Sequence, residues 1–125
     1  MALDIAITEH GTEGRRVILT GRLDTDTAPL LDACVARLLA SPQVTALTFD
    51  LAALEYISSA GIRSVVRARK AVEGRGGRVT LAHLQPPVQK VFDIVRALPA
   101  ADIFQSTAEL DAYLDAMQRR VRADG

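Results

Sequence analysis

The sequence predicts an α/β fold: one domain with a mixed β-sheet of four to five strands and about four α-helices. The chain has 125 residues, 49% of them hydrophobic, which is enough for one buried core. Apolar residues first alternate with polar ones and later recur at helical spacing, so strands and helices follow one another. Aromatic residues make up only 4% and Trp is absent, so aliphatic side chains must fill the core. That composition suits helices packed on a sheet.

The first part of the chain is predicted to form two strands, a helix and a third strand. Residues 3–8 alternate apolar and polar side chains, and residues 16–20 read as a second strand joined to the first by a hairpin turn at 10–14. Residues 25–41 predict a helix, because Thr-Asp-Thr-Ala-Pro at its start supplies a capping hydroxyl or carboxylate and a first-turn proline. Residues 45–51 form a mainly apolar run that is typical of a buried strand.

The next part continues the alternation of helix and strand. Apolar residues line one face of a helix over residues 59–73, and Gly74 offers a stop. Residues 78–82 predict a strand, and a helix opens at Pro86-Pro87. Helices between successive strands require crossover connections, so we expect a parallel part of the sheet and an antiparallel hairpin at its start.

The C-terminal part is predicted to hold a last helix. Ser106-Thr107-Ala108-Glu109 is a capping box, and an apolar stripe follows it. A short strand at 102–105 is possible on its Ile-Phe pair. We expect the domain to span residues 1–118, with residues 119–125 as a frayed tail.

Charge and composition exclude several function classes. Fifteen basic and fifteen acidic residues give a net charge of zero, so no global positive field attracts nucleic acid or an anionic membrane. The lone Cys34 cannot form an internal disulfide and is expected in the core, and no secretory signal or membrane-spanning stretch is evident. His10 and His83 lack metal-ligand spacing. We therefore expect a cytoplasmic protein without metal or cofactor and without nucleic-acid or membrane partners.

The most informative segment is residues 50–62, which read Asp-Leu-Ala-Ala-Leu-Glu-Tyr-Ile-Ser-Ser-Ala-Gly-Ile. Ser58 and Ser59 fall at the predicted start of a helix, where unpaired backbone N–H groups and the positive end of the helix dipole accommodate an anion such as a phosphate. Simple helix capping by a serine is the alternative, and it is the commoner use of this position.

Two blocks together resemble a known family. Residues 50–62 are similar to the signature of STAS domains, the family of bacterial anti-sigma factor antagonists, in which a strand ending in Asp-Leu leads to an apolar pair and a Ser-containing, Gly-containing helix start. Residues 21–28, Gly-Arg-Leu-Asp-Thr-Asp-Thr-Ala, resemble the Gly-x-Leu-Asp stretch of the family before its first helix. The predicted order of elements agrees along nearly the whole chain.

The resemblance implies partner switching. An unphosphorylated antagonist binds an anti-sigma factor with a histidine-kinase-like ATPase fold, that partner phosphorylates a serine of the antagonist with its own ATP, and a PP2C-type phosphatase restores binding. The acceptor serine of the family corresponds to Ser59. The family often has Asp before it, where this chain has Ser58, so Ser58 is the alternative acceptor.

The same resemblance implies a partner surface around the two blocks. Each member has a structural alternative: Asp24 is equally suited to order the first helix, Asp50 either orients the serine loop or bonds nearby backbone N–H groups, and an exposed Arg63 or Arg67 is more often a solvated side chain. The predicted surface comprises Asp24, Thr25, Ser58, Ser59, Gly61, Ile62 and Arg63.

An enzymatic function is not expected. A hydrolase nucleophile elbow needs Gly-x-Ser-x-Gly and a His after an acidic residue, whereas Tyr56-Ile57 precede the serines and His83 is the only later His. The glycine-rich residues 74–77 precede a strand, so they predict a turn and not a phosphate loop. The remaining alternative is a STAS module that acts without phosphorylation, as a scaffold or as a regulatory subunit of a transporter.

Overall fold

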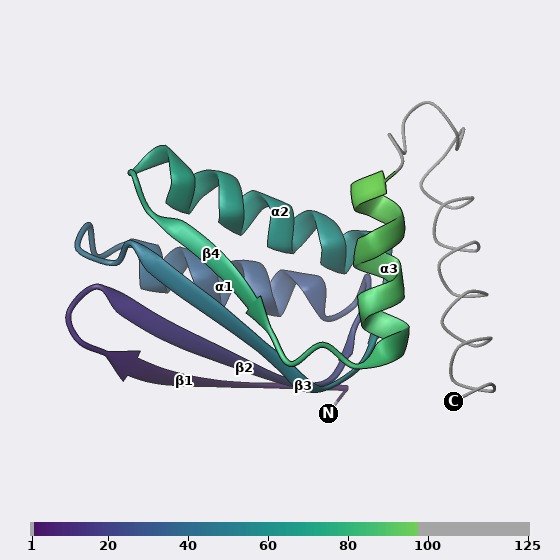
Figure 1. Ribbon diagram of the computed structural model, residues 1–125. Coiled ribbons are helices and arrows are strands. Elements are labelled where there is room, and N and C mark those ends of the chain that lie inside the picture. Colours follow the sequence, from purple (N-terminus) through teal and green to yellow (C-terminus); the bar gives the residue numbers. More distant parts are fainter. Residues whose placement is uncertain (1, 98–125) are drawn as a thin grey trace.

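The computed structural model describes residues 2–97, which form one four-stranded sheet and three helices (Figure 1). The sheet order is β1-β2-β3-β4, with β1 antiparallel to β2 and the other neighbours parallel. The predicted α/β class, with a mixed sheet and an initial hairpin, is confirmed. In chain order the elements are β1 (Leu3–His10), β2 (Gly14–Leu23), α1 (Ala28–Leu39), β3 (Ala46–Ile57), α2 (Ser59–Gly74), β4 (Arg78–Ala82) and α3 (Pro86–Ala97).

The predicted elements beyond residue 97 lie outside the described residues. These are the short strand at 102–105, the helix that starts at Ser106 and the tail at 119–125. The domain limits of 1–118 therefore stay a prediction.

The hairpin of β1 and β2 is longer than the alternating pattern predicts. Pairing runs without interruption from Leu3 opposite Gly21 to His10 opposite Gly14. The loop between the strands contains Gly11 at a φ of 71°, a conformation that glycine adopts at little cost. Because tertiary pairing continues through polar residues at the hairpin end, the sequence pattern alone ends β1 too early and starts β2 too late.

The prediction for β3 is wrong in its length. The apolar run predicts a strand over residues 45–51 that Asp50 ends, whereas β3 continues to Ile57. Between the pairs Ile18–Asp50 and Thr20–Ala53, β3 holds one more residue than β2, and a second shift follows at Gly21. Such bulges break the two-residue alternation by which a strand is recognised, so the second half of β3 does not look like a strand in the sequence.

The start of α1 is only partly as predicted. Pro29 lies in the first turn, as expected, but the N-cap residue Thr27 makes no side-chain cap bond. Its hydroxyl instead donates to Arg22 O at 2.9 Å and accepts from Asp24 N at 2.8 Å. The threonine is therefore used to hold the turn before the helix and not the helix N–H groups.

The glycine-rich residues 74–77 form a turn between α2 and β4, as predicted, with Gly76 at a φ of 83°. Arg75 in this turn donates to the carbonyl oxygens of Leu39, Ser41 and Val44 at 2.8, 2.9 and 3.1 Å. The turn thereby ties the end of α2 to the end of α1, and the two helices lie side by side on one face of the sheet (Figure 1).

The core lies between the sheet and these helices and is mainly aliphatic, as the composition predicts. Cys34 is buried on α1. The fully buried side chains of β2 and β3 include Leu19, Leu23, Leu47, Phe49 and Ile57. Their alternate neighbours along each strand point to the other face of the sheet.

Candidate functional site

Two segments that are far apart in the sequence meet at the carboxyl ends of β2 and β3. The strands are adjacent and parallel, and their last pair joins Leu23 with Ile57. Ser58 N donates to Leu23 O at 2.9 Å, one residue further on. The residues that follow β2, Asp24 and Thr25, therefore lie beside the serines that follow β3.

Ser58 is the N-cap of α2. Its backbone is extended, with φ and ψ of −96° and 176°, and its Oγ accepts a hydrogen bond from Gly61 N at 3.3 Å. The capping alternative for this residue is thus confirmed. Ser58 is only 4% exposed and Ser59 only 3% exposed. They lie at the positive end of a helix of 16 residues whose first turn carries no acidic side chain.

Gly61 explains how the start of α2 approaches the end of β2. A Cβ at this position would lie 2.7 Å from Leu23 Cγ, 2.9 Å from Ile57 Cγ1 and 2.9 Å from Leu23 O. Only glycine fits this contact without a shift. Gly61 and Ile62 are buried, and Ile62 belongs to the core cluster.

The predicted partner surface thus divides into two groups by exposure. Thr25 and Arg63 are exposed and Asp24 is half-buried, whereas the serines, Gly61 and Ile62 form the layer beneath them. The structure brings the exposed and buried members to one end of the sheet.

Asp24 orders the turn before α1, one of the two uses predicted for it. Its Oδ1 accepts from Asp26 N at 3.0 Å and from Thr27 N at 3.1 Å, and its carbonyl accepts from Ala28 N at 2.8 Å. These bonds fix the direction of the carboxylate, since an Asx turn holds the side chain against its own backbone. Its second carboxylate oxygen, Oδ2, is not used by these bonds.

Asp50 does not orient the serine loop. Its Oδ2 accepts from Arg16 at 2.9 Å and its Oδ1 accepts from Ala52 N at 3.1 Å, at the β3 bulge. The hydrogen bond from Arg16, and then that from Ala52, hold the pKa of Asp50 below its usual value. From Asp50 to Ile57 the strand spans roughly 20 Å, so the ion pair is remote from Ser59. The alternative, bonding to a nearby backbone N–H, is confirmed.

The two arginines of α2 differ in their surroundings. Arg63 is exposed, whereas Arg67 forms an ion pair with Asp32 of α1 at 2.8 Å between largely exposed side chains. An ion pair of this kind contributes little stability but holds the Arg67 side chain toward α1. Arg63 is therefore the better placed of the two to meet a partner.

One feature of the site was not predicted from the sequence. The guanidinium of Arg22 lies over the ring of Tyr56, with its Cζ 4.1 Å from the ring centroid. The two residues are paired across β2 and β3, one position before the Leu23–Ile57 pair. A cation–π contact of this kind stiffens the strand ends beside the serines. The sequence holds no signal for it, because the β3 bulges decide which residues face each other.

Within residues 2–97, no group of three His, Cys, Asp or Glu side chains is arranged to hold a metal ion. In the same part of the chain, no helix is long and apolar enough to cross a membrane.

The fold and the site define a small α/β domain with a mixed sheet, helices on one face and a candidate interaction surface at a helix N-terminus. The chain belongs to the STAS domain family, because residues 7–110 match that family. The family predicted from the two sequence blocks is thereby confirmed.

Solved structures with the same fold include anti-sigma factor antagonists. The chain is similar to the unphosphorylated form of SpoIIAA, with 22% identity and a TM-score of 0.63 over 73% of this chain and 83% of that one. It is similar to the phosphorylated form of the Bacillus cell fate determinant SpoIIAA, with 22% identity and a TM-score of 0.64 over 74% and 83%. An anti-sigma factor antagonist from Mycobacterium paratuberculosis matches with 20% identity and a TM-score of 0.61 over 96% and 94%.

Proposed function

We propose that this protein is a cytoplasmic anti-sigma factor antagonist that acts in a phosphorylation-controlled partner switch. The unphosphorylated form binds an anti-sigma factor that is also a serine kinase with a histidine-kinase-like ATPase fold. Phosphorylation of Ser59 ends the complex, and a PP2C-type phosphatase restores it. The protein is not an enzyme and binds no cofactor in this scheme, because the kinase supplies the ATP.

The observation that carries this proposal is the meeting of the Asp24–Thr25 turn with Ser58 and Ser59 at the start of α2. The Ser58 N to Leu23 O bond of 2.9 Å joins the two segments. A phosphate on Ser59 adds about −1.5 to −2 charges at the positive end of α2, where the helix stabilises an anion. The free domain therefore tolerates the modification.

A complex does not tolerate it in the same way. The added phosphate would lie at the same end of the sheet as the half-buried Asp24, whose carboxylate direction is fixed by its turn. A partner that packs on this surface must strip water from both negative groups, which costs free energy. Moving a complex from mostly bound to mostly free requires about 5 kcal/mol of differential affinity, a magnitude that a buried and repelled dianion supplies.

Burial of the serines adds a requirement to the kinase step. Because Ser59 is 3% exposed, the kinase must open the first turn of α2 to reach Ser59 Oγ. That opening breaks the cap bond between Ser58 Oγ and Gly61 N. Phosphorylation is therefore expected to be faster when the cap is weakened, provided that the acceptor is Ser59.

The same burial favours a second candidate function. A STAS module that acts without phosphorylation, as a scaffold or as a regulatory subunit of a transporter, would need no access to Ser59. In that case the exposed Thr25 and Arg63 would contact the partner while Ser58 and Ser59 serve the helix start alone.

The test combines a pull-down with phosphorylation. The full chain is incubated with candidate histidine-kinase-like anti-sigma factors and ATP, and mass spectrometry locates the phosphate. We expect one phosphate on Ser59, none on Ser59→Ala, and unchanged modification of the matched control Ser64→Ala, a serine that is equally buried on the same helix. Ser59→Asp is expected to weaken binding without unfolding the domain.

Each other outcome is informative. A phosphate that persists on Ser59→Ala moves the acceptor to Ser58. Binding that ATP and Ser59→Asp leave unchanged favours the module without phosphorylation. Failure to bind any such kinase would contradict the proposed partner switch.

A further inference from the structure

Within residues 2–97, no further strand pairs with the outer edge of β1. Among the described strands β1 pairs with β2 alone. Arg22 N donates to Ala2 O at 2.7 Å, so Ala2 and every second residue after it direct their backbone groups toward β2. The residues between them, from Leu3 through Ile5 and Ile7 to Glu9, must direct their N–H and C=O groups away from the sheet. A further strand can therefore pair along this edge.

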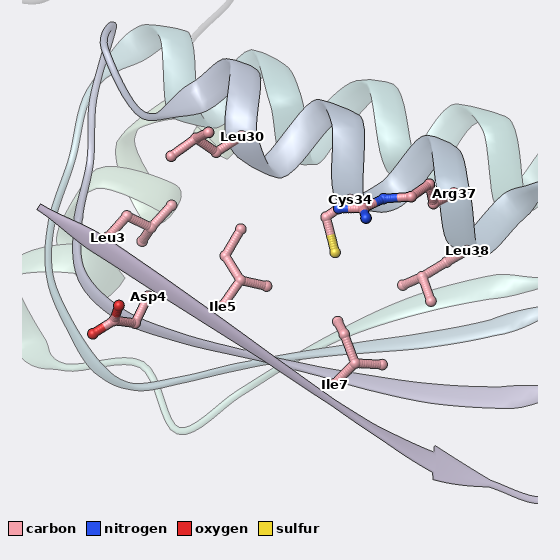
Figure 2. A pocket seen from close by; sticks show the side chains of 8 residues that line it. All are labelled: Leu3, Asp4, Ile5, Ile7, Leu30, Cys34, Arg37 and Leu38. Carbon is pink, nitrogen blue, oxygen red and sulfur yellow. The ribbon is translucent and has the colours of Figure 1, made fainter. Parts of the chain in front are cut away.

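An apolar groove adjoins this edge. Figure 2 shows Leu3, Ile5 and Ile7 of β1 pointing toward Leu30 and Cys34 of α1. The groove has a volume of about 570 Å³. Ile7 and Leu30 are 37% and 47% exposed, and they are two of the three large hydrophobic residues that are exposed among residues 2–93. Exposed apolar side chains that gather beside a free edge indicate an interaction surface.

Several of the usual protections of an edge strand are absent from β1, although it carries the charged residues Asp4 and Glu9. Its sequence, Leu-Asp-Ile-Ala-Ile-Thr-Glu-His, contains neither Pro nor Lys, and its pairing with β2 has no bulge. Natural proteins use such devices to prevent edge pairing, so an edge of eight residues that lacks Pro, Lys and a bulge, and that lies beside an apolar groove, is available to a partner strand.

The chemistry of β1 is complementary to itself. When a second β1 runs antiparallel with Ala6 opposite Ala6, Ile5 lies opposite Ile7, Asp4 lies opposite Thr8 and Leu3 lies opposite Glu9. No two like charges face each other, and the outward backbone groups at residues 3, 5, 7 and 9 of the two copies meet along the shared side. The net charge of zero also leaves no overall repulsion between two copies.

We propose that two copies of this chain form a two-fold symmetric dimer by antiparallel pairing of their β1 strands about Ala6. The two sheets join into one, and Ile5 and Ile7 of each copy help to close the groove of the other. This surface is separate from the carboxyl ends of β2 and β3, so the inference does not rest on the proposed function.

The first test is sedimentation of the full chain over a concentration range from about 5 to 500 μM. The range is wide because an interface made by one pair of strands and one groove is small, and small interfaces are weak. Ile7→Lys places a charge on the inner side of the edge and is expected to raise the dimer dissociation constant by about tenfold or more. Val66→Lys is the matched control, because Val66 is 38% exposed but lies on α2. It is expected to leave the dimer unchanged.

The second test keeps the proposal falsifiable if Ile7→Lys unfolds the domain. In a Cys34→Ala background that still sediments as a dimer, Ala6→Cys is expected to form a disulfide between copies, because directly opposite residues have Cα atoms about 4.5 to 5.5 Å apart. Thr8→Cys is its control, since the same register places the two copies of residue 8 roughly 14 Å apart.

Four results would overturn the dimer. They are a monomer at every concentration, a dimer that Ile7→Lys leaves intact in a folded protein, a dimer without the Ala6→Cys cross-link, and a monomer whose thermal midpoint rises with palmitate. The last result would assign the groove to a small apolar ligand.

Discussion

Gly61 offers the sharpest test of how α2 is seated against β2. In Gly61→Ala the new methyl group would lie 2.7 Å from Leu23 Cγ, 2.9 Å from Ile57 Cγ1 and 2.9 Å from Leu23 O. The side-chain atoms can move by a few tenths of an ångström, but Leu23 O also accepts the hydrogen bond from Ser58 N. The start of the helix must therefore move away from the strand.

The expected size follows from two opposing effects. Overpacking of a dense site costs about 1 to 3 kcal/mol, and this contact falls in the upper part of that range because one neighbour is backbone. Alanine in place of glycine inside a helix stabilises by about 1 kcal/mol. The net effect is a destabilisation of about 1 to 2 kcal/mol, or a fall in Tm of roughly 4 to 8 °C for a domain of this size.

Thermal and urea unfolding followed by circular dichroism measure the change. The control is Gly74→Ala at the other end of α2, where no atom lies within 4 Å of the added Cβ. That variant has the same gain in helix propensity without the clash, so its Tm should stay level or rise. A Gly61→Ala protein as stable as Gly74→Ala would refute the close approach of α2 to β2.

Two further predictions concern single polar groups. Because Arg16 and the Ala52 N–H hold the pKa of Asp50 below its usual value, the ionised carboxylate stabilises the fold above about pH 4, and this contribution is lost as the pH falls through the lowered pKa. Asp50→Asn should thus lower the urea midpoint at pH 7 and lower it less at pH 3, and an equal loss at both would contradict the ion pair. Ser64 is 2% exposed, and its hydroxyl has no hydrogen-bond partner in the described part of the chain. Ser64→Ala should raise the free energy of unfolding by about 1 kcal/mol, and a lower Tm would instead show that the hydroxyl is bonded.

The sequence predicts the elements whose local pattern agrees with their tertiary contacts. The strand at Arg78–Ala82 and the helix opening at Pro86 lie where the pattern places them, and α2 ends within one residue of the predicted stop. In each case a turn or cap residue marks the boundary, so local chemistry is enough. The second half of β3 could not be predicted, because its bulges are set by the pairing with β2 and leave no regular pattern within the strand itself.

The sequence predicts which residues form the candidate site, but it does not predict how deeply the serines are buried. Parallel neighbours bring the ends of β2 and β3 together, so the meeting of Asp24 with Ser58 follows once the order of strands is known. Burial of Ser58 and Ser59 depends on how closely α2 approaches Leu23, which only the packing of Gly61 reveals. The sequence itself indicates an ordering role for Asp24 and a cap role for Ser58 as alternatives, because both residue types commonly bond nearby backbone groups.

The hydrogen bond from Ser58 N to Leu23 O has a consequence for what a partner can sense. A displacement of the first turn of α2 removes the donor from Leu23 O, and Leu23 leads directly into the turn that holds Asp24 and Thr25. A movement of the serines therefore removes a hydrogen bond that holds the start of the Asp24–Thr25 turn. The affinity of a protein that contacts only Thr25 would therefore still change when a serine is modified. The surface whose binding depends on the modification can thus be larger than the modified serines themselves.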